Sequence, residues 1–135
     1  MTIYLDASVA VSLFTEDAHS GSAQRLVKKS AVLLLSDLTA GEFSSALAIQ
    51  YCNGRVTEAD VRAAYANFDA WRETIARSIE VLPSDLRAAQ AIIRQLQHPD
   101  ATHILIARRL GAALETFDAT LAREAPRLGL SLVEP

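Results

Sequence analysis

The sequence predicts an α/β fold in which helices cover both faces of a central parallel sheet of four to five strands. Short apolar stretches of strand length alternate with longer helical stretches along the 135 residues, and such alternation forms parallel sheets through right-handed crossovers. The stretch 31–36 is apolar without alternation, which is typical of a parallel strand buried on both faces. The composition, 50% hydrophobic and 21% charged, is that of a globular protein, and we expect a single domain over residues 1–135.

Two strands and four helices are expected in the first half of the chain. In order, they are a strand over 2–5, helices from 7 to about 15 and from about 19 to 29, a strand over 31–36, a helix from 40 to about 53, and a helix that begins after residue 57. Asn53-Gly54-Arg55 is a stop and turn signal, and Thr57 caps the helix that follows. That helix carries Phe68 and Trp71 on one apolar stripe, which we assign to the core.

The second half continues the alternation. We expect a short strand over 79–82, helices from 83 to about 96 and from 99 to about 110, a strand over 112–116, a helix from 119 to about 124 and a candidate fifth strand over 130–133. Pro83 and Pro99 mark the starts of the two longer helices, and Gly111 marks the end of the second. If the first strand is central and the chain winds outward before it returns, the first and fourth strands are neighbours. Asp6 and Asp118 then face each other.

Four acidic residues lie where an apolar strand ends or a helix begins: Asp6, Glu42, Asp100 and Asp118. Ligand sites of open parallel sheets lie beyond the carboxyl ends of the strands, so these carboxylates can meet although they are far apart in the sequence. Four carboxylates in one cleft repel one another, and a divalent cation neutralises them. The pattern indicates a shared metal cleft.

Each acid also has a local structural explanation. Glu42 completes Thr39-x-x-Glu42, a capping box. Asp100 stands in a first helical turn, where the helix dipole favours a carboxylate, and Asp118 is a preferred N-cap residue. Asp6 is the hardest to explain locally, because Asp is depleted in strands and here it directly follows one.

Composition and termini limit the class of protein. The net charge of −3 gives no general attraction to nucleic acid. No apolar run approaches the roughly 20 residues that cross a bilayer, and the first residues lack the features of a secretory signal. We therefore expect a cytosolic protein with no membrane partner. The single cysteine, Cys52, has no disulfide partner, and we expect it to be buried.

Motifs at both ends of the chain resemble a known family. The opening Ile3-Tyr4-Leu5-Asp6-Ala7-Ser8-Val9 resembles that of a PIN domain, particularly of the VapC-type toxins of bacterial and archaeal toxin–antitoxin pairs. Ala40-Gly41-Glu42 is similar to the second acidic motif of the family. The third and fourth motifs are matched in order and spacing by Asp100-Ala101-Thr102-His103-Ile104-Leu105-Ile106-Ala107, Gly111-Ala112, Thr116-Phe117-Asp118 and Leu121-Ala122. The similarity covers essentially the whole chain, although residues 54–97 carry no motif.

The resemblance implies a three-layer PIN-like domain and a metal-dependent endoribonuclease that cuts single-stranded or structured RNA as a toxin. It implies an acidic pocket for Mg²⁺ or Mn²⁺ with two supporting hydroxyls, made by Asp6, Glu42, Asp100, Asp118, Ser8 and Thr116. It also implies a homodimer and a small cognate antitoxin that covers the cleft. The chain departs from the family pattern at two places: His98-Pro99 precedes Asp100, and Glu115 adds a further negative charge beside the pocket.

The chemistry of the acids agrees with this role. Mg²⁺ and Mn²⁺ prefer hard oxygen ligands and keep several waters. Such a metal lowers the pKa of a bound water and offsets the charge on a scissile phosphate. We expect Asp6, Asp100 and Asp118 to be direct or water-mediated ligands, and Glu42 to be a ligand or the group that orients the attacking water. No protein nucleophile is needed.

Other polar residues are assigned structural roles. His103 lies three residues after Asp100, on a neighbouring helix face. We expect it to be partly buried with one hydrogen bond, and we assign His19 and His98 to the surface. Six basic residues could bind an RNA backbone, but basic residues more often simply lie on solvated helix faces. The six are Arg25, Lys28, Lys29, Arg94, Arg108 and Arg109.

Two other functions stay open at this point. A small phosphatase or a receiver domain also places acids at strand ends of an α/β sheet. An aspartyl-type phosphatase needs a second Asp two residues after the first, where this chain has Ser8, and a receiver needs a late lysine, whereas no lysine follows Lys29. The other alternative is a PIN-like module that binds a partner without catalysis, which a metal titration would distinguish.

Overall fold

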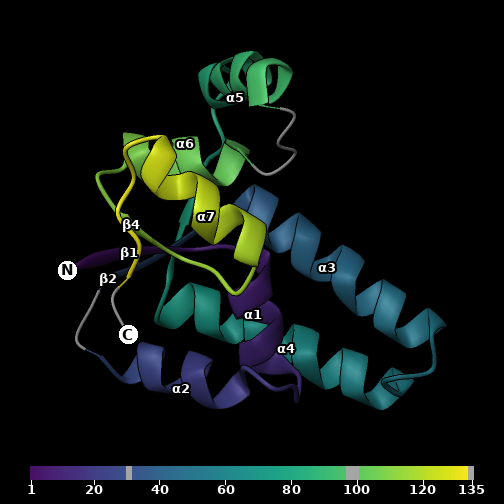
Figure 1. The fold of residues 1–135 in the computed structure, drawn as a ribbon. Helices are drawn as coiled ribbons and strands as arrows, with labels where there is room; N and C mark the ends of the chain where they lie inside the picture. Colours follow the sequence, from purple (N-terminus) through teal and green to yellow (C-terminus); the bar gives the residue numbers. More distant parts are fainter. Residues whose placement is uncertain (30–31, 97–100, 134–135) are drawn as a thin grey trace.

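A four-stranded parallel sheet forms the centre of the fold. The structure is a computed structural model, which describes residues 1–29, 32–96 and 101–133. The strands are β1 (Thr2–Leu5), β2 (Val32–Ser36), β3 (Arg77–Ile79) and β4 (Ala113–Glu115), in the spatial order β3-β2-β1-β4. The chain winds outward from β1 and returns beside it as β4, as the sequence predicts (Figure 1).

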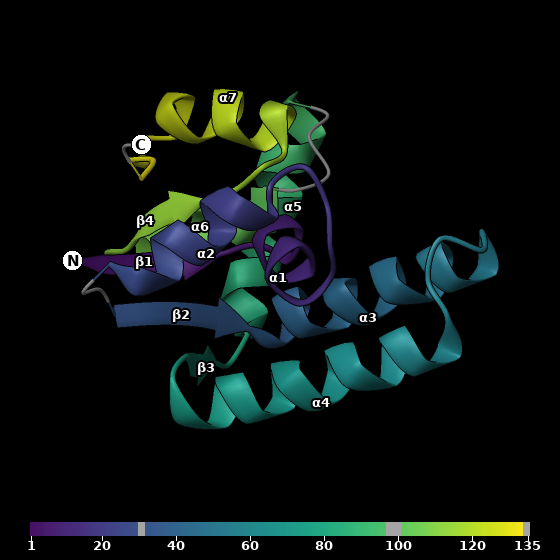
Figure 2. The ribbon, with the colours of Figure 1, turned by 90° about the horizontal axis from the view of Figure 1, so that it is seen from below.

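Helices cover both faces of this sheet. They are α1 (Ala7–Phe14), α2 (Ser20–Lys28), α3 (Asp37–Cys52), α4 (Glu58–Thr74), α5 (Pro83–Leu96), α6 (Ala101–Arg109) and α7 (Ala119–Arg127). Helices α1 to α4 pack on one face and α6 and α7 on the other (Figure 2), which confirms the predicted three-layer arrangement. Helix α5 packs against α6, outside these layers (Figure 1). None of the described helices is long and apolar enough to cross a membrane.

The side chains of β1 divide the core in two. Ile3 and Leu5 face α1 to α4, whereas Tyr4 faces α6 and α7, and all three are fully buried. A strand buried on both faces reads as an uninterrupted apolar run, which is why the sequence marks it well. The predicted stripe on α4 is also in the core, where Phe68 stacks on Phe43 of α3 with 4.3 Å between ring centroids.

Two predicted strands differ in the structure. β3 covers 77–79 rather than 79–82, because it pairs with β2 in the register that joins Leu34 to Arg77 and Ser36 to Ile79. It is an edge strand whose first two residues are exposed, so an apolar pattern does not mark it. Of the candidate fifth strand, the described residues form one bridge, between Leu114 and Leu132.

Helix α3 begins three residues earlier than predicted. Ser36 Oγ accepts from the Thr39 N–H, and Thr39 Oγ1 accepts from the Ser36 N–H, both at 3.3 Å. This capping box replaces the one expected between Thr39 and Glu42, so the local explanation of Glu42 is wrong. Cys52, at the other end of α3, is exposed rather than buried, because the hairpin of α3 and α4 projects beyond the sheet (Figure 2).

Helix α6 ends at the predicted glycine. Gly111 has a φ of 62°, a left-handed conformation that glycine adopts without strain. The Ala112 N–H donates to the Ala107 carbonyl at 3.0 Å, which closes the helix and turns the chain into β4. The strand that follows this turn pairs with β1.

Candidate active site

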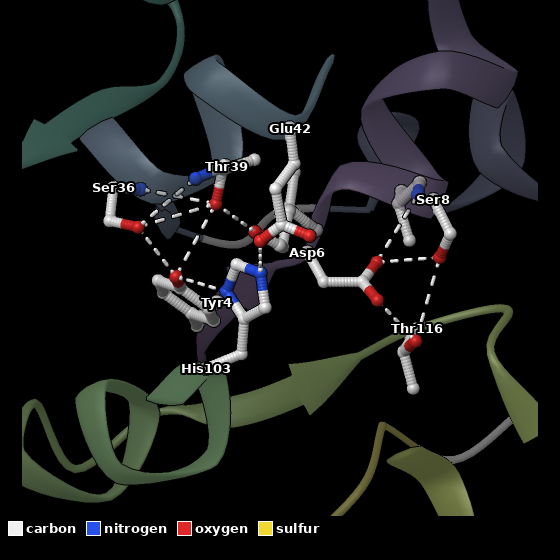
Figure 3. A network of polar contacts seen from close by, with 10 residues as sticks. Tyr4, Asp6, Ser8, Ser36, Thr39, Glu42, His103 and Thr116 are labelled. Carbon is white, nitrogen blue, oxygen red and sulfur yellow. Dashed lines mark hydrogen bonds and ion pairs between the residues drawn. The ribbon is translucent and has the colours of Figure 1, made fainter. Parts of the chain in front are cut away.

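Asp6 lies at the carboxyl end of β1, where it caps α1. Its carboxylate accepts from the Val9 N–H at 3.3 Å and from the Ser8 hydroxyl at 2.6 Å, both through Oδ1. The second oxygen, Oδ2, accepts from the hydroxyl of Thr116 in the loop after β4 (Figure 3). Ser8 and Thr116, the two hydroxyl residues expected to support the acidic pocket, are therefore in direct contact with Asp6.

The environment of Asp6 disfavours its charge. Asp6 is only 4% exposed, and burial raises the pKa of its carboxyl, although the hydrogen bonds from Ser8 and Thr116 act to lower it. Glu115 lies next to Asp6, with its backbone carbonyl accepting from the Asp6 N–H at 3.3 Å. Burial and the charge of Asp6 raise the pKa of the Glu115 carboxyl too, so this end of the sheet concentrates negative charge.

Hydrogen bonds join the loops that follow β1 and β4. Ser8 Oγ accepts from the Phe117 N–H at 2.9 Å, and Thr116 Oγ1 accepts from the Asp118 N–H at 3.0 Å. Asp118 caps α7, because its Oδ1 accepts from the amides of Thr120 and Leu121. Asp118 is therefore the N-cap residue that the sequence allowed. Its amide also binds Thr116, which in turn binds Asp6, so Asp118 lies near Asp6.

Glu42 projects from α3 toward the same end of the sheet. Its Oε1 lies 2.6 Å from Nε2 of His103 on α6. The Glu42 side chain is 42% exposed and that of His103 is 3% exposed. Glu42 therefore lies at the boundary between a buried polar cluster and solvent. His103 is more deeply buried than expected and has two hydrogen-bond partners, Tyr4 and Glu42, where one was expected.

A chain of buried polar groups continues behind His103. The imidazole Nδ1 lies 2.7 Å from the hydroxyl of Tyr4, which lies 2.7 Å from Ser36 Oγ (Figure 3). Thr39, also next to Tyr4, donates its hydroxyl to the Leu5 carbonyl at 3.0 Å. Burial raises the pKa of the Tyr4 hydroxyl to about 12, against the lowering effect of its bonds to Ser36 and Thr39.

One cavity of about 430 Å³ brings several of these residues to solvent. Glu42, Asp118 and Ser8 line it, together with Asp17 and His19 from the turn between α1 and α2. His19 is exposed, as assigned, but its ring stacks on Phe117 with 4.6 Å between centroids and an angle of 12°. The sequence did not mark Asp17 or His19 as site residues, because neither lies at a strand end.

The basic residues are divided between structural and exposed roles. Arg109 forms two bonds with Asp85, at 2.8 and 2.9 Å. Burial alone would raise the pKa of Asp85, but the bonds from Arg109 and the Leu82 amide hold it below its usual range. Arg25 and Lys29, in contrast, line a second cavity of about 540 Å³ together with Glu115 and Phe117. Basic side chains thus border the acidic site.

The donor set fits a divalent metal such as Mg²⁺ or Mn²⁺. Carboxylates and hydroxyls are the hard oxygen ligands these ions take, and a cation offsets the cost of keeping buried Asp6 charged next to Glu115. The fourth expected acid, Asp100, lies outside the described residues. Among the residues that the structure does describe, no three His, Cys, Asp or Glu side chains form a metal-binding group.

Comparisons with known proteins identify the fold. VapC20 of Mycobacterium tuberculosis, described as a sarcin–ricin loop cleaving toxin, has a similar structure, with a TM-score of 0.73, 25% identity, and 98% of this chain and 99% of that chain covered. VapBC2 of Rickettsia felis, solved with a DNA fragment from its promoter, aligns with a TM-score of 0.67 at 14% identity, covering 98% of both chains. At that identity the likeness shows the fold alone.

No curated protein sequence matches the chain. A profile of the PIN domain, in contrast, matches residues 3–125. This span includes β1 from Ile3 onward, β4 and every acid predicted from the sequence. The phosphatase and receiver alternatives lose their support, and the chain belongs to the PIN domain family.

Proposed function

We propose that the protein is a metal-dependent endoribonuclease that acts in the cytosol as the toxin of a toxin–antitoxin pair. The observation that carries the proposal is the buried carboxylate of Asp6, held by Ser8 and Thr116 at the carboxyl edge of a PIN fold. The similarity to VapC20, described as a toxin that cleaves the sarcin–ricin loop, supports a structured RNA as the substrate. A cognate antitoxin and a homodimer are further parts of the proposal, which the resemblance to VapC-type toxins implies.

The acids have separate roles in this proposal. Asp6, Asp100 and Asp118 hold Mg²⁺ or Mn²⁺, and Glu42 is a further ligand or orients the attacking water. When bound, the metal supplies an acidified water and stabilises charge on the phosphate. Ser8 and Thr116 fix both oxygens of Asp6 in place, so little side-chain freedom is lost when the site is used. Hydrolysis then adds water across a phosphodiester bond without a covalent enzyme intermediate.

Cleavage of total cellular RNA by the purified protein tests the proposal. Wild type, Asp6→Asn and Asp69→Asn are compared with Mg²⁺, with Mn²⁺ and with a chelator. Asp69 is an exposed acid on α4, away from the cavity, and its variant is the matched control. Discrete fragments are expected from wild type and Asp69→Asn, only with metal present.

Two results would contradict the proposal in different ways. Equal cleavage by wild type and Asp6→Asn would indicate a contaminating nuclease. Absence of both cleavage and metal binding, the latter measured by calorimetry, would favour the non-catalytic binding module. Metal-dependent fragments from wild type and Asp69→Asn, with none from Asp6→Asn, would support the proposal and allow their ends to be mapped and the RNA to be identified.

A further inference from the structure

We propose that Tyr4 and His103 are positioning residues, which hold Glu42 in one orientation at the cavity through a buried chain of hydrogen bonds. The role of Glu42 in catalysis rests on the proposed function, but the arrangement of the chain itself does not. The chain runs from Ser36 through Tyr4 and His103 to Glu42, with successive distances of 2.7, 2.7 and 2.6 Å. It joins β2, β1, α6 and α3.

The first three members of this chain are shielded from water. Ser36 and Tyr4 are 0% exposed and His103 is 2% exposed. Buried polar groups of this kind depend on one another for hydrogen bonds, because water does not replace a missing partner. Only the Glu42 end reaches solvent, with 42% of its side chain exposed. The chain thus connects the rigid core to a side chain in the cavity.

The direction of the hydrogen bonds follows from counting protons. An ionised Glu42 only accepts, so His103 Nε2 must donate to it. The hydroxyl of Thr39 donates to the Leu5 carbonyl, and Ser36 Oγ already accepts from the Thr39 N–H. The Ser36 proton is then available for the Tyr4 oxygen, and Tyr4 donates its own proton to His103 Nδ1. Every proton has one close acceptor.

The opposite direction satisfies fewer groups. If His103 Nδ1 donated to Tyr4, the Tyr4 proton would point either at Ser36 Oγ or at Thr39 Oγ1. In the first case the Ser36 proton has only Thr39 Oγ1 as an acceptor, at 3.5 Å, and in the second case the Tyr4 proton lies in a contact of 3.3 Å. Both distances are long for a bond between hydroxyls. The hydrogen-bond pattern therefore favours a neutral imidazole with its proton on Nε2.

This tautomer has a consequence for the site. Glu42 has a long side chain on a helix surface, and without a partner it would populate several rotamers. A donor fixed at Nε2 binds one carboxylate oxygen and leaves the other for the cavity that Glu42 shares with Ser8 and Asp118. A carboxylate held in this way loses less freedom when it binds a water or a metal.

The first experiment measures the His103 ring in the metal-free protein. Nitrogen-15 NMR distinguishes the two neutral tautomers and the protonated ring, and the His103→Gln variant identifies the signals by their loss. We expect the Nε2–H form in wild type and a change of the ring signals in Tyr4→Phe, which lacks the donor to Nδ1. An Nδ1–H ring in wild type, or one that is unchanged in Tyr4→Phe, would overturn the proposal.

The second experiment measures RNA cleavage by four variants whose folding is checked by thermal melts. Tyr4→Phe and His103→Leu break the chain, His103→Gln keeps an N–H donor of similar reach, and Tyr65→Phe is the control. Tyr65 is a partly buried tyrosine of α4 whose hydroxyl lies 3.5 Å from the Ser44 carbonyl, outside the chain. The control separates loss of a hydroxyl from loss of positioning.

Positioning predicts a specific pattern of rate constants. We expect kcat to fall about ten- to a hundredfold in Tyr4→Phe and His103→Leu, with KM little changed and most of the rate retained in His103→Gln. If the two variants match Tyr65→Phe in kcat, the positioning role is wrong. If wild type cuts no RNA, the proposed function fails, while the ring spectrum still decides whether the chain exists.

Discussion

At the scale of single residues, Asp6 shows how a fold keeps a charge that its surroundings oppose. The carboxylate caps α1, accepts two hydroxyls and is nearly buried. Capping and hydrogen bonds favour the ionised form, whereas burial disfavours it, and burial prevails. The residue is therefore fixed in place but electrostatically costly unless a cation lies next to it.

This balance predicts how stability depends on pH. The pKa of Asp6 is raised in the folded protein. The contribution of Asp6 to the free energy of unfolding is therefore fully present below the pKa of an Asp in the unfolded chain, about 4, and is lost as pH rises through the folded pKa. Asn caps a helix as well as Asp does, so Asp6→Asn keeps the cap and removes the charge. Metal-free Asp6→Asn should melt at a higher temperature than wild type at pH 7.

Thermal melts in chelator between pH 4 and pH 8 check this expectation. The advantage of Asp6→Asn should shrink toward the acid end, where the wild-type carboxyl is protonated too. Asp69→Asn, which removes an exposed charge, should follow the wild-type curve. A lower melting temperature for Asp6→Asn across the whole range would mean that the hydrogen bonds of the carboxylate outweigh its burial.

The candidate site residues could be selected only where the sequence carries a local signal. The strand ends are visible in the apolar pattern, and this was enough to select Asp6, Glu42 and Asp118. The partner of Glu42 was not predictable, because His103 is separated from it by 61 residues and the two meet only once α3 and α6 are placed. The assumed capping box failed for a local reason: Ser and Thr both cap helices, and Ser36 rather than Thr39 begins the helix.

At the scale of elements, the loop after β4 serves a helix and a site together. Asp118 uses Oδ1 to cap α7, and its backbone is bound to Thr116. A carboxylate has a second oxygen, so capping and metal binding are compatible within one residue. The capping and the catalytic explanations of Asp118 therefore do not exclude each other.

Two substitutions at Asp118 separate these roles. Asp118→Ala removes both the cap and the charge and should cost about 1 kcal/mol of stability, whereas Asp118→Asn should keep the cap and stay close to wild type in urea unfolding. Both variants should lose metal-dependent RNA cleavage. An active Asp118→Asn variant would show that Asp118 acts only as a cap.

The least predictable elements lie at the edge of the sheet. β3 is short and partly exposed, so its position is set by pairing with β2 and by the ion pair of Arg109 with Asp85 next to it. The carbonyl of Glu80, just after β3, also accepts from Arg109, at 3.1 Å. Such partners come from distant parts of the chain, and an apolar pattern does not contain them.

At the scale of the whole molecule, the strand order was predictable because few topologies satisfy the rules of parallel sheets. Right-handed crossovers and a central first strand lead to the order β3-β2-β1-β4. The same rules place the ends of β1 and β4 side by side, which is why a site was expected between them. Details that depend on side-chain partners, such as the start of α3, required the structure.

Metal binding should be visible in global stability. A ligand that binds only the folded state stabilises it by about 2.7 kcal/mol at a hundred times its Kd. Saturating Mn²⁺ should therefore raise the melting temperature of wild type and of Asp69→Asn but not of Asp6→Asn. If Mn²⁺ stabilises Asp6→Asn equally, the ion binds elsewhere on the protein.

The bond between Asp6 and Thr116 spans 110 residues of the chain. During synthesis, Asp6 is made together with Ser8, whereas Thr116 is made 110 residues later. One of the two hydroxyls that hold Asp6 therefore arrives long after the other. For an enzyme proposed to cut RNA, this order means that the growing chain has no assembled site until β4 and the loop after it have been synthesised.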